Sequence, residues 1–116
     1  MCVGNHVGMI DAFTLTAIYN PSYLSNYNNK HIYPFGTFAT NVQCLWVKRA
    51  KDSRIKIIKS ITERMKNYRE HPDLYSPLCI LPEGTVTNGL GLLQFKKGPF
   101  KDFEPVKMFC SEYTKE

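Results

Sequence analysis

The chain has no internal repeat, no low-complexity tract and no apolar run that approaches the roughly 18 to 20 residues needed to cross a bilayer. Its first residues also lack the basic and then apolar layout typical of a signal peptide. These absences exclude a repeat protein and a membrane-spanning segment within the sequence, so any membrane attachment is peripheral or lies elsewhere. The 116 residues allow one domain with a modest core.

Cysteine is scarce, and no C-x-x-C pair or other spacing indicates a zinc site or a small disulfide scaffold. The four cysteines are Cys2, Cys44, Cys79 and Cys110. We therefore expect reduced, mostly buried thiols and no bound metal. A G-x-S-x-G elbow is also absent, which argues against a serine hydrolase.

The composition is that of an ordinary globular protein, with 43% hydrophobic and 22% charged residues. Fifteen Lys and Arg against ten Asp and Glu give a net charge of +5, which suits an anionic partner. Nucleic acid, an acidic membrane surface and a phosphorylated substrate all fit this charge. Because no zinc, RRM-like or helix-turn-helix pattern appears, we expect no nucleic-acid partner.

Periodicity and turn residues predict strands that alternate with helices. The expected strands are the residues before the turn at 4–6, then 44–47, 78–81, 92–95 and 106–110. The expected helices are 10–19, 37–42 and a helix from Asp52 or Ser53 to about Tyr68, with Ile55, Ile58, Ile61, Met65 and Tyr68 as its apolar stripe. Residues 22–33 are polar and aromatic without a period, which favours a loop or an interface segment. This alternation predicts an α/β fold with a mixed, largely parallel sheet flanked by helices.

His6 and Asp11 are the first candidates for chemistry. On one continuous helix, residues five apart point about 140° away from each other, so the two side chains could not meet there. They can meet if His6 lies in the turn before the helix and Asp11 in its first turn. A carboxylate bonded to one imidazole nitrogen leaves the other nitrogen free to take a proton from a hydroxyl. A helix-capping Asp beside a surface His is the alternative.

The segment Pro82-Glu83-Gly84-Thr85-Val86-Thr87-Asn88-Gly89 directly follows an expected buried strand. At the carboxyl end of a strand in an α/β sheet, glycines and hydroxyl groups let backbone N–H groups approach phosphate closely. A plain connecting turn is equally compatible with this segment.

Two further cationic positions stand near expected strand ends. Arg49 follows the strand at 44–47, where its guanidinium can grip phosphate with two hydrogen bonds, although a lone surface Arg is usually only solvated. Lys96 stands with Lys97 between Phe95 and Phe100. That arrangement suits an interfacial or anionic ligand, but it is also common in turns.

Taken in order, these segments resemble the glycerolipid acyltransferases, the family of 1-acylglycerol-3-phosphate and lysophospholipid acyltransferases. The four matching motifs are N-H-x-x-x-x-D from Asn5 and His6 to Asp11, a second motif from Cys44 to Arg49, Pro82-Glu83-Gly84-Thr85, and the approximate match Glu104-Pro105-Val106. The branch most similar to this sequence is that of the lysophosphatidylcholine and lysophosphatidylethanolamine acyltransferases. Pro99 and Met108 depart from the family pattern, where Ala and a second Pro are usual.

The resemblance implies transfer of a fatty acyl group from acyl-CoA, as co-substrate and without cofactor or metal, to the free hydroxyl of a lysophospholipid. It assigns His6 as the base that deprotonates the hydroxyl and Asp11 as the residue that orients it. It assigns substrate binding to six other residues, of which the first four hold the acceptor's phosphate: Arg49, Glu83, Gly84, Thr85, Asn88 and Lys96. A phosphatidate-forming enzyme and a non-catalytic lipid-binding relic are the alternatives.

The family also carries membrane-embedding segments before the first motif and further structure after the fourth. We therefore expect residues 1–116 to be a single acyltransferase core fragment with an incomplete fold. The resemblance further implies an intracellular, membrane-associated protein of the endoplasmic reticulum.

Overall fold

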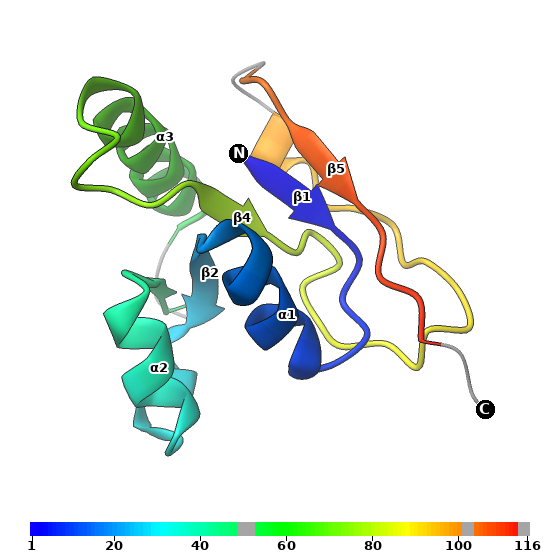
Figure 1. Ribbon diagram of the computed structural model, residues 1–116. Helices are drawn as coiled ribbons and strands as arrows, with labels where there is room; N and C mark the ends of the chain where they lie inside the picture. Colours follow the sequence, from blue (N-terminus) through cyan, green and yellow to red (C-terminus); the bar gives the residue numbers. More distant parts are fainter. Residues whose placement is uncertain (49–52, 101–103, 114–116) are drawn as a thin grey trace.

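The computed structural model describes residues 1–48, 53–100 and 104–113. Its strands form one sheet in the order β3-β2-β4-β1-β5, and every pairing between them is parallel (Figure 1). The strands are β1 (Cys2–Gly4), β2 (Ser22–Asn26), β3 (Leu45–Val47), β4 (Leu78–Ile80) and β5 (Lys107–Phe109). The predicted α/β class with a largely parallel sheet and flanking helices is confirmed.

Helices cover both faces of this sheet. They are α1 (Ile10–Tyr19), α2 (Phe35–Asn41) and α3 (Arg54–Glu70), with short 3-10 turns η1 (Tyr27–His31) and η2 (Gly98–Phe100). One core cluster joins α1 and α2 to the sheet, and a second joins α3 to the opposite face. Along β4, Leu78 and Ile80 enter the α3 cluster while Cys79 enters the other, because successive side chains of a strand point to opposite faces.

The helix boundaries follow from local chemistry. Asn20 takes a left-handed conformation (φ 44°) after the last turn of α1, and Pro21 follows it. The Ser53 side chain accepts a hydrogen bond from the Lys56 N–H and caps the start of α3. Among the described residues, no helix is long and apolar enough to cross a membrane.

The face of α3 that meets the sheet differs from the predicted stripe. Ile61 and Met65 are buried as expected, but Ile55 is 80% exposed. Arg64, which is not part of the predicted stripe, is buried, and its guanidinium donates to the backbone and side-chain oxygens of Gln43. A long side chain with satisfied donors can lie in an interface that an apolar stripe does not mark.

Two segment predictions were wrong. Residues 22–33, expected as a loop, contain β2 and η1, because the backbone of β2 pairs with β3 and β4 and the buried Tyr23 hydroxyl donates to the Ala12 carbonyl. Residues 92–95, expected as a strand, have no regular structure, because the Leu93 N–H donates to the Glu83 carboxylate instead of to a neighbouring strand.

The cysteines are free thiols, as predicted. Cys2 and Cys79 are buried, Cys44 is half-buried and Cys110 is exposed. Burial raises the pKa of both the Cys44 and the Cys79 thiol to about 12, so these two side chains stay protonated at neutral pH.

Candidate active site

The parallel strands place four loops at one edge of the sheet. His6 lies two residues beyond β1, and the loop that begins at Leu81 follows β4, the neighbour of β1. Tyr27 follows β2 and Lys48 follows β3 at the same edge, because the carboxyl ends of parallel strands lie together. In α/β sheets this edge is where ligands bind.

The structure brings the His6 and Asp11 side chains together, in the arrangement that their spacing requires. His6 lies in the turn before α1 and Asp11 is the second residue of the helix. Nδ1 of His6 lies 3.1 Å from Oδ2 of Asp11, with the His6 side chain 20% exposed and that of Asp11 fully buried. An ionised carboxylate only accepts hydrogen bonds, so Nδ1 carries the proton and the lone pair of Nε2 is left to act as a base.

The Asp11 carboxylate is held from several sides. Its Oδ2 also accepts the backbone N–H groups of Val7 (2.7 Å) and Gly8 (2.9 Å), and its Oδ1 accepts the Tyr113 hydroxyl (2.5 Å). Burial would raise the pKa of Asp11, but the hydrogen bonds from Tyr113, Gly8, His6 and Val7 outweigh burial and lower the pKa below its ordinary value of 3.8. Asp11 is therefore a carboxylate at neutral pH.

Tyr113 is a site residue that the sequence analysis missed. It stands beyond the fourth motif and 102 residues after Asp11, so no local spacing connects the two. Its segment is held beside the end of β1 by Asn5, whose side chain donates to the Ser111 carbonyl (2.8 Å) and accepts the Ser111 N–H (2.7 Å). The hydrogen bond to Asp11 raises the pKa of Tyr113 to about 12, so its hydroxyl keeps the proton that it donates.

The loop after β4 fixes the backbone of His6. The Glu83 carboxylate, which is 4% exposed, accepts the His6 N–H on Oε1 (2.7 Å) and the Leu93 N–H on Oε2 (2.9 Å). The Thr87 N–H donates to the His6 carbonyl (2.8 Å). Both backbone groups of His6 are thus hydrogen-bonded to one loop. Glu83, a predicted binding residue, therefore lies next to His6, the predicted base.

The other predicted binding residues lie along the same loop or outside the described chain. Gly84 has a φ of +75°, and a Cβ placed on it would lie 2.5 Å from the Lys96 ammonium, so these two predicted residues are neighbours. Thr85 and Asn88 are exposed, and the Asn88 side chain accepts the Leu90 N–H (3.1 Å). The prediction for Arg49 falls outside the described residues.

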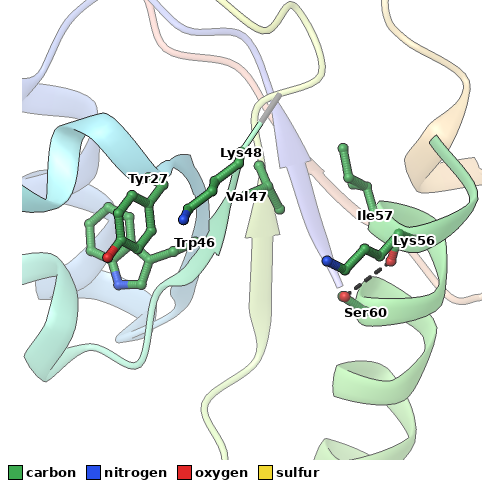
Figure 2. A pocket seen from close by; sticks show the side chains of 7 residues that line it. All are labelled: Tyr27, Trp46, Val47, Lys48, Lys56, Ile57 and Ser60. Atoms are coloured by element: carbon green, nitrogen blue, oxygen red, sulfur yellow. Dashed lines mark hydrogen bonds between the residues drawn. The ribbon is translucent and has the colours of Figure 1, made fainter. Parts of the chain in front are cut away.

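A cavity of 320 Å³ opens farther along the same edge (Figure 2). Residues near the ends of β2 and β3 line one side and residues of α3 line the other: Tyr27, Trp46, Val47, Lys48, Lys56, Ile57 and Ser60. The Lys48 ammonium lies 4.4 Å from the centre of the Tyr27 ring. Within the described part of the chain, no group of three or more His, Cys, Asp or Glu could hold a metal ion.

Comparison with known proteins shows the family to which the chain belongs. A family model described as Acyltransferase matches residues 1–106. Since this match covers nearly the whole chain, the protein belongs to the acyltransferase family.

Three relatives narrow the kind of acyltransferase that the chain is similar to. The lysophospholipid acyltransferase LPEAT1 of Arabidopsis thaliana is 31% identical over 98% of this chain and 29% of its own length. Lysophosphatidylcholine acyltransferase 1 of Danio rerio is 31% identical over 96% of the chain and 21% of its own length. Glycerol-3-phosphate acyltransferase 3 of Gallus gallus is 32% identical over 87% of the chain and 22% of its own length. The chain thus spans less than a third of each relative, and no solved structure matches it.

Proposed function

We propose that the chain carries the catalytic core of an acyl-CoA-dependent O-acyltransferase that acts on the free hydroxyl of a lysophospholipid. The observation that supports this proposal most is the bond between His6 Nδ1 and the buried Asp11 carboxylate, which leaves Nε2 as a base. The similarity to a lysophospholipid and a lysophosphatidylcholine acyltransferase supports the acceptor class.

In the proposed reaction, His6 Nε2 takes the proton of the acceptor hydroxyl while that oxygen attacks the thioester carbonyl carbon. The tetrahedral intermediate then expels the CoA thiolate as the C–S bond breaks, and the imidazolium returns the proton to the sulfur. Asp11 holds the Nδ1 proton and stabilises the transient positive charge on the ring. Because the Val7 and Gly8 N–H groups hold the same carboxylate oxygen, the ring and the start of α1 keep a fixed relative position.

We further assign the acceptor's phosphate to the loop after β4. Gly84 and Thr85 offer backbone and hydroxyl groups, Lys96 offers a cation beside Gly84, and Asn88 is the fourth proposed contact. Arg49 is proposed from its match to the second motif. Glu83 is proposed to contribute through the hydrogen bonds that fix the His6 backbone.

The surroundings of His6 suit a lipid interface. Large apolar side chains are exposed on the first turns of α1 and its approach, and on the loop after β4: Met9, Ile10, Phe13, Val86, Leu90, Leu92 and Leu93. Clustered exposed apolar groups mark contact sites for lipid or other apolar partners. We therefore propose that this edge meets the membrane surface. From the family resemblance alone, we propose that the protein works inside the cell at the endoplasmic reticulum.

The proposal is tested by the release of free thiol from acyl-CoA in mixed micelles, with and without lysophosphatidylcholine. We expect His6→Ala to lower the acceptor-dependent rate by roughly 10²-fold or more, the usual effect of losing a general base. His71→Ala is the matched control, because His71 is exposed just after α3. Turnover of His6→Ala equal to that of the control would remove His6 from the mechanism.

The second candidate function is transfer to a phosphate monoester acceptor, such as 1-acylglycerol-3-phosphate. The similarity to a glycerol-3-phosphate acyltransferase favours this possibility. Replacing lysophosphatidylcholine with lysophosphatidate or glycerol-3-phosphate in the same assay distinguishes the two candidate functions. A lipid-binding relic would bind these acceptors and release no thiol from acyl-CoA with any of them.

A further inference from the structure

We propose that Tyr113 is a positioning residue for the catalytic pair, and that its bond to Asp11 sets the orientation of His6 and how readily Nε2 accepts a proton. This inference rests on the proposed function, since it concerns the base of that reaction. Tyr113 lies beyond residues 1–106, which the family model matches. It therefore adds to the site a residue that the matched motifs do not contain.

The bond from Tyr113 completes the hold on the Asp11 carboxylate. Oδ2 meets Nδ1 of His6 and accepts the N–H groups of Val7 and Gly8, all in the turn before α1. Oδ1 accepts the Tyr113 hydroxyl at 2.5 Å, from a segment near the other end of the chain. A carboxylate bonded at both oxygens cannot turn about its Cβ–Cγ bond without breaking a hydrogen bond. The Tyr113 bond therefore fixes the direction from which Oδ2 meets the His6 ring.

The segment after β5 is attached to the same turn that carries the base. β5 runs parallel to β1, so the chain leaves both strands at the same edge of the sheet (Figure 1). The buried Asn5 side chain, directly before His6, donates to the Ser111 carbonyl (2.8 Å) and accepts the Ser111 N–H (2.7 Å). Tyr113 is two residues farther on. Asn5 thus fixes the segment of Tyr113 beside the turn of His6, and the contact with Asp11 follows from the fold.

A tyrosine donor at Oδ1 also limits how strongly Asp11 favours a second proton on His6. A whole negative charge beside an imidazole stabilises its protonated form. The Tyr113 hydroxyl offsets part of that charge through its hydrogen bond. The same bond raises the pKa of Tyr113 to about 12, so the hydroxyl remains a donor at neutral pH. Nε2 should therefore become available as a base at a lower pH than it would beside a carboxylate without this bond.

Other titratable groups lie on the elements around the pair, and all of them are kept in Tyr113→Phe. They are Glu83 and Lys96 on the loop after β4, Cys2 on β1, Cys79 on β4, Tyr23 on β2, and Glu112 beside Tyr113 in the sequence. A shift of the pH dependence in this variant therefore reports the loss of one hydroxyl.

The first test needs no turnover. Diethyl pyrocarbonate reacts with an imidazole nitrogen only when that nitrogen carries no proton, and peptide mass spectrometry follows the reaction at His6 alone. We expect its rate to rise with pH, and the rise to lie roughly half a pH unit higher in Tyr113→Phe, a fraction of the one to three units that a whole neighbouring charge contributes. Tyr33→Phe, at a side chain that is 87% exposed, should leave the profile unchanged. Because Tyr113 is itself 48% exposed, its variant should keep the fold.

The second test is acyl transfer from acyl-CoA to lysophosphatidylcholine. We expect Tyr113→Phe to lower kcat by roughly 3- to 10-fold, the usual effect of one hydrogen bond, and to leave KM for the acceptor nearly unchanged. The acid side of its pH–rate profile should move to higher pH, as in the modification of His6.

The inference fails if His6 in Tyr113→Phe is modified with the profile of the unchanged protein. It also fails if the variant loses rate equally at every pH, because Tyr113 would then be a purely structural contact. A shifted modification profile in a protein that transfers no acyl group would refute the proposed function alone.

Discussion

Asp11 accepts hydrogen bonds from His6, Val7, Gly8 and Tyr113 although its side chain is fully buried. A buried carboxylate is tolerated only where such donors compensate for the loss of water. The charge of Asp11 is therefore coupled both to the orientation of His6 and to the stability of the fold.

The first prediction at this scale concerns acid stability. The folded pKa of Asp11 is lowered, so its stabilising contribution is complete above the unfolded value of 3.8 and is lost as pH falls through the lower folded pKa. We expect Asp11→Asn to lower the free energy of unfolding in urea at neutral pH. The difference from wild type should shrink as pH falls below 3.8. Asp73→Asn, at an exposed turn, is the control.

A second prediction concerns Tyr113, which supplies the largest contribution that lowers the pKa of Asp11. Tyr113→Phe removes this hydrogen bond and keeps the ring, so the pKa of Asp11 should rise. The side-chain carbon resonance of Asp11, assigned by its absence in Asp11→Asn, measures this shift in an NMR titration. Tyr33→Phe, at a more exposed tyrosine, is the control. An unchanged Asp11 titration in the Tyr113 variant would mean that the two side chains do not meet in solution.

Sequence reasoning found His6 and Asp11 because they are five residues apart and one local turn decides whether they meet. Sequence reasoning could not find the contact between Tyr113 and Asp11 or the contact between Glu83 and His6. Those contacts span 102 and 77 residues and exist only once the strand order β4-β1-β5 has formed. Local spacing thus predicted that His6 and Asp11 meet, and tertiary pairing supplied the groups that hold them.

At the scale of the elements, the loop after β4 is a support for the turn after β1. Neither segment is a helix or a strand, yet Glu83 and Thr87 bond the two backbone groups of His6. Parallel neighbours make this possible, because β1 and β4 deliver their following loops to the same edge.

The same pairing explains which elements the sequence could predict. Residues 10–19 and α3 carry strong helical patterns, and the observed helices match within about two residues, the usual uncertainty of helix ends. β2 was missed because Ser22 and Asn26 are polar, and its place between β3 and β4 rests on backbone pairing. Residues 92–95 have an apolar pattern typical of a strand, but the buried Glu83 takes the Leu93 N–H.

A third prediction tests the hydrogen bond by which Glu83 fixes the backbone of His6. Glu83→Gln keeps one acceptor oxygen and replaces the other with an amide nitrogen, so either the His6 or the Leu93 N–H loses its partner. We expect stability to fall by roughly 1 to 3 kcal/mol, the cost of a buried unpaired donor. Below the unfolding transition, kcat should fall by roughly 10-fold or more while KM for the acceptor changes little, because misplacement of the base affects the transition state. Glu63→Gln, exposed on α3, is the control. A higher KM with unchanged kcat would instead place Glu83 in direct contact with substrate.

At the scale of the whole molecule, exposed apolar side chains lie on both segments that flank His6, while the chain carries a net charge of +5. Together they predict binding to vesicles that contain anionic lipid, with an electrostatic part that salt weakens and an apolar part that it does not.

Leu90 is 86% exposed on the loop after β4, and Ile55 is 80% exposed on α3, which covers the other face of the sheet from α1. If the edge around His6 enters the lipid interface, Leu90→Ser should weaken sedimentation with vesicles by roughly 10-fold, the effect of about 1.5 kcal/mol of buried side chain. Ile55→Ser removes a similar apolar surface and should have little effect. Equal losses in the two variants would mean that the chain meets the vesicle without a preferred face, and the lipid acceptor would then need another route to His6.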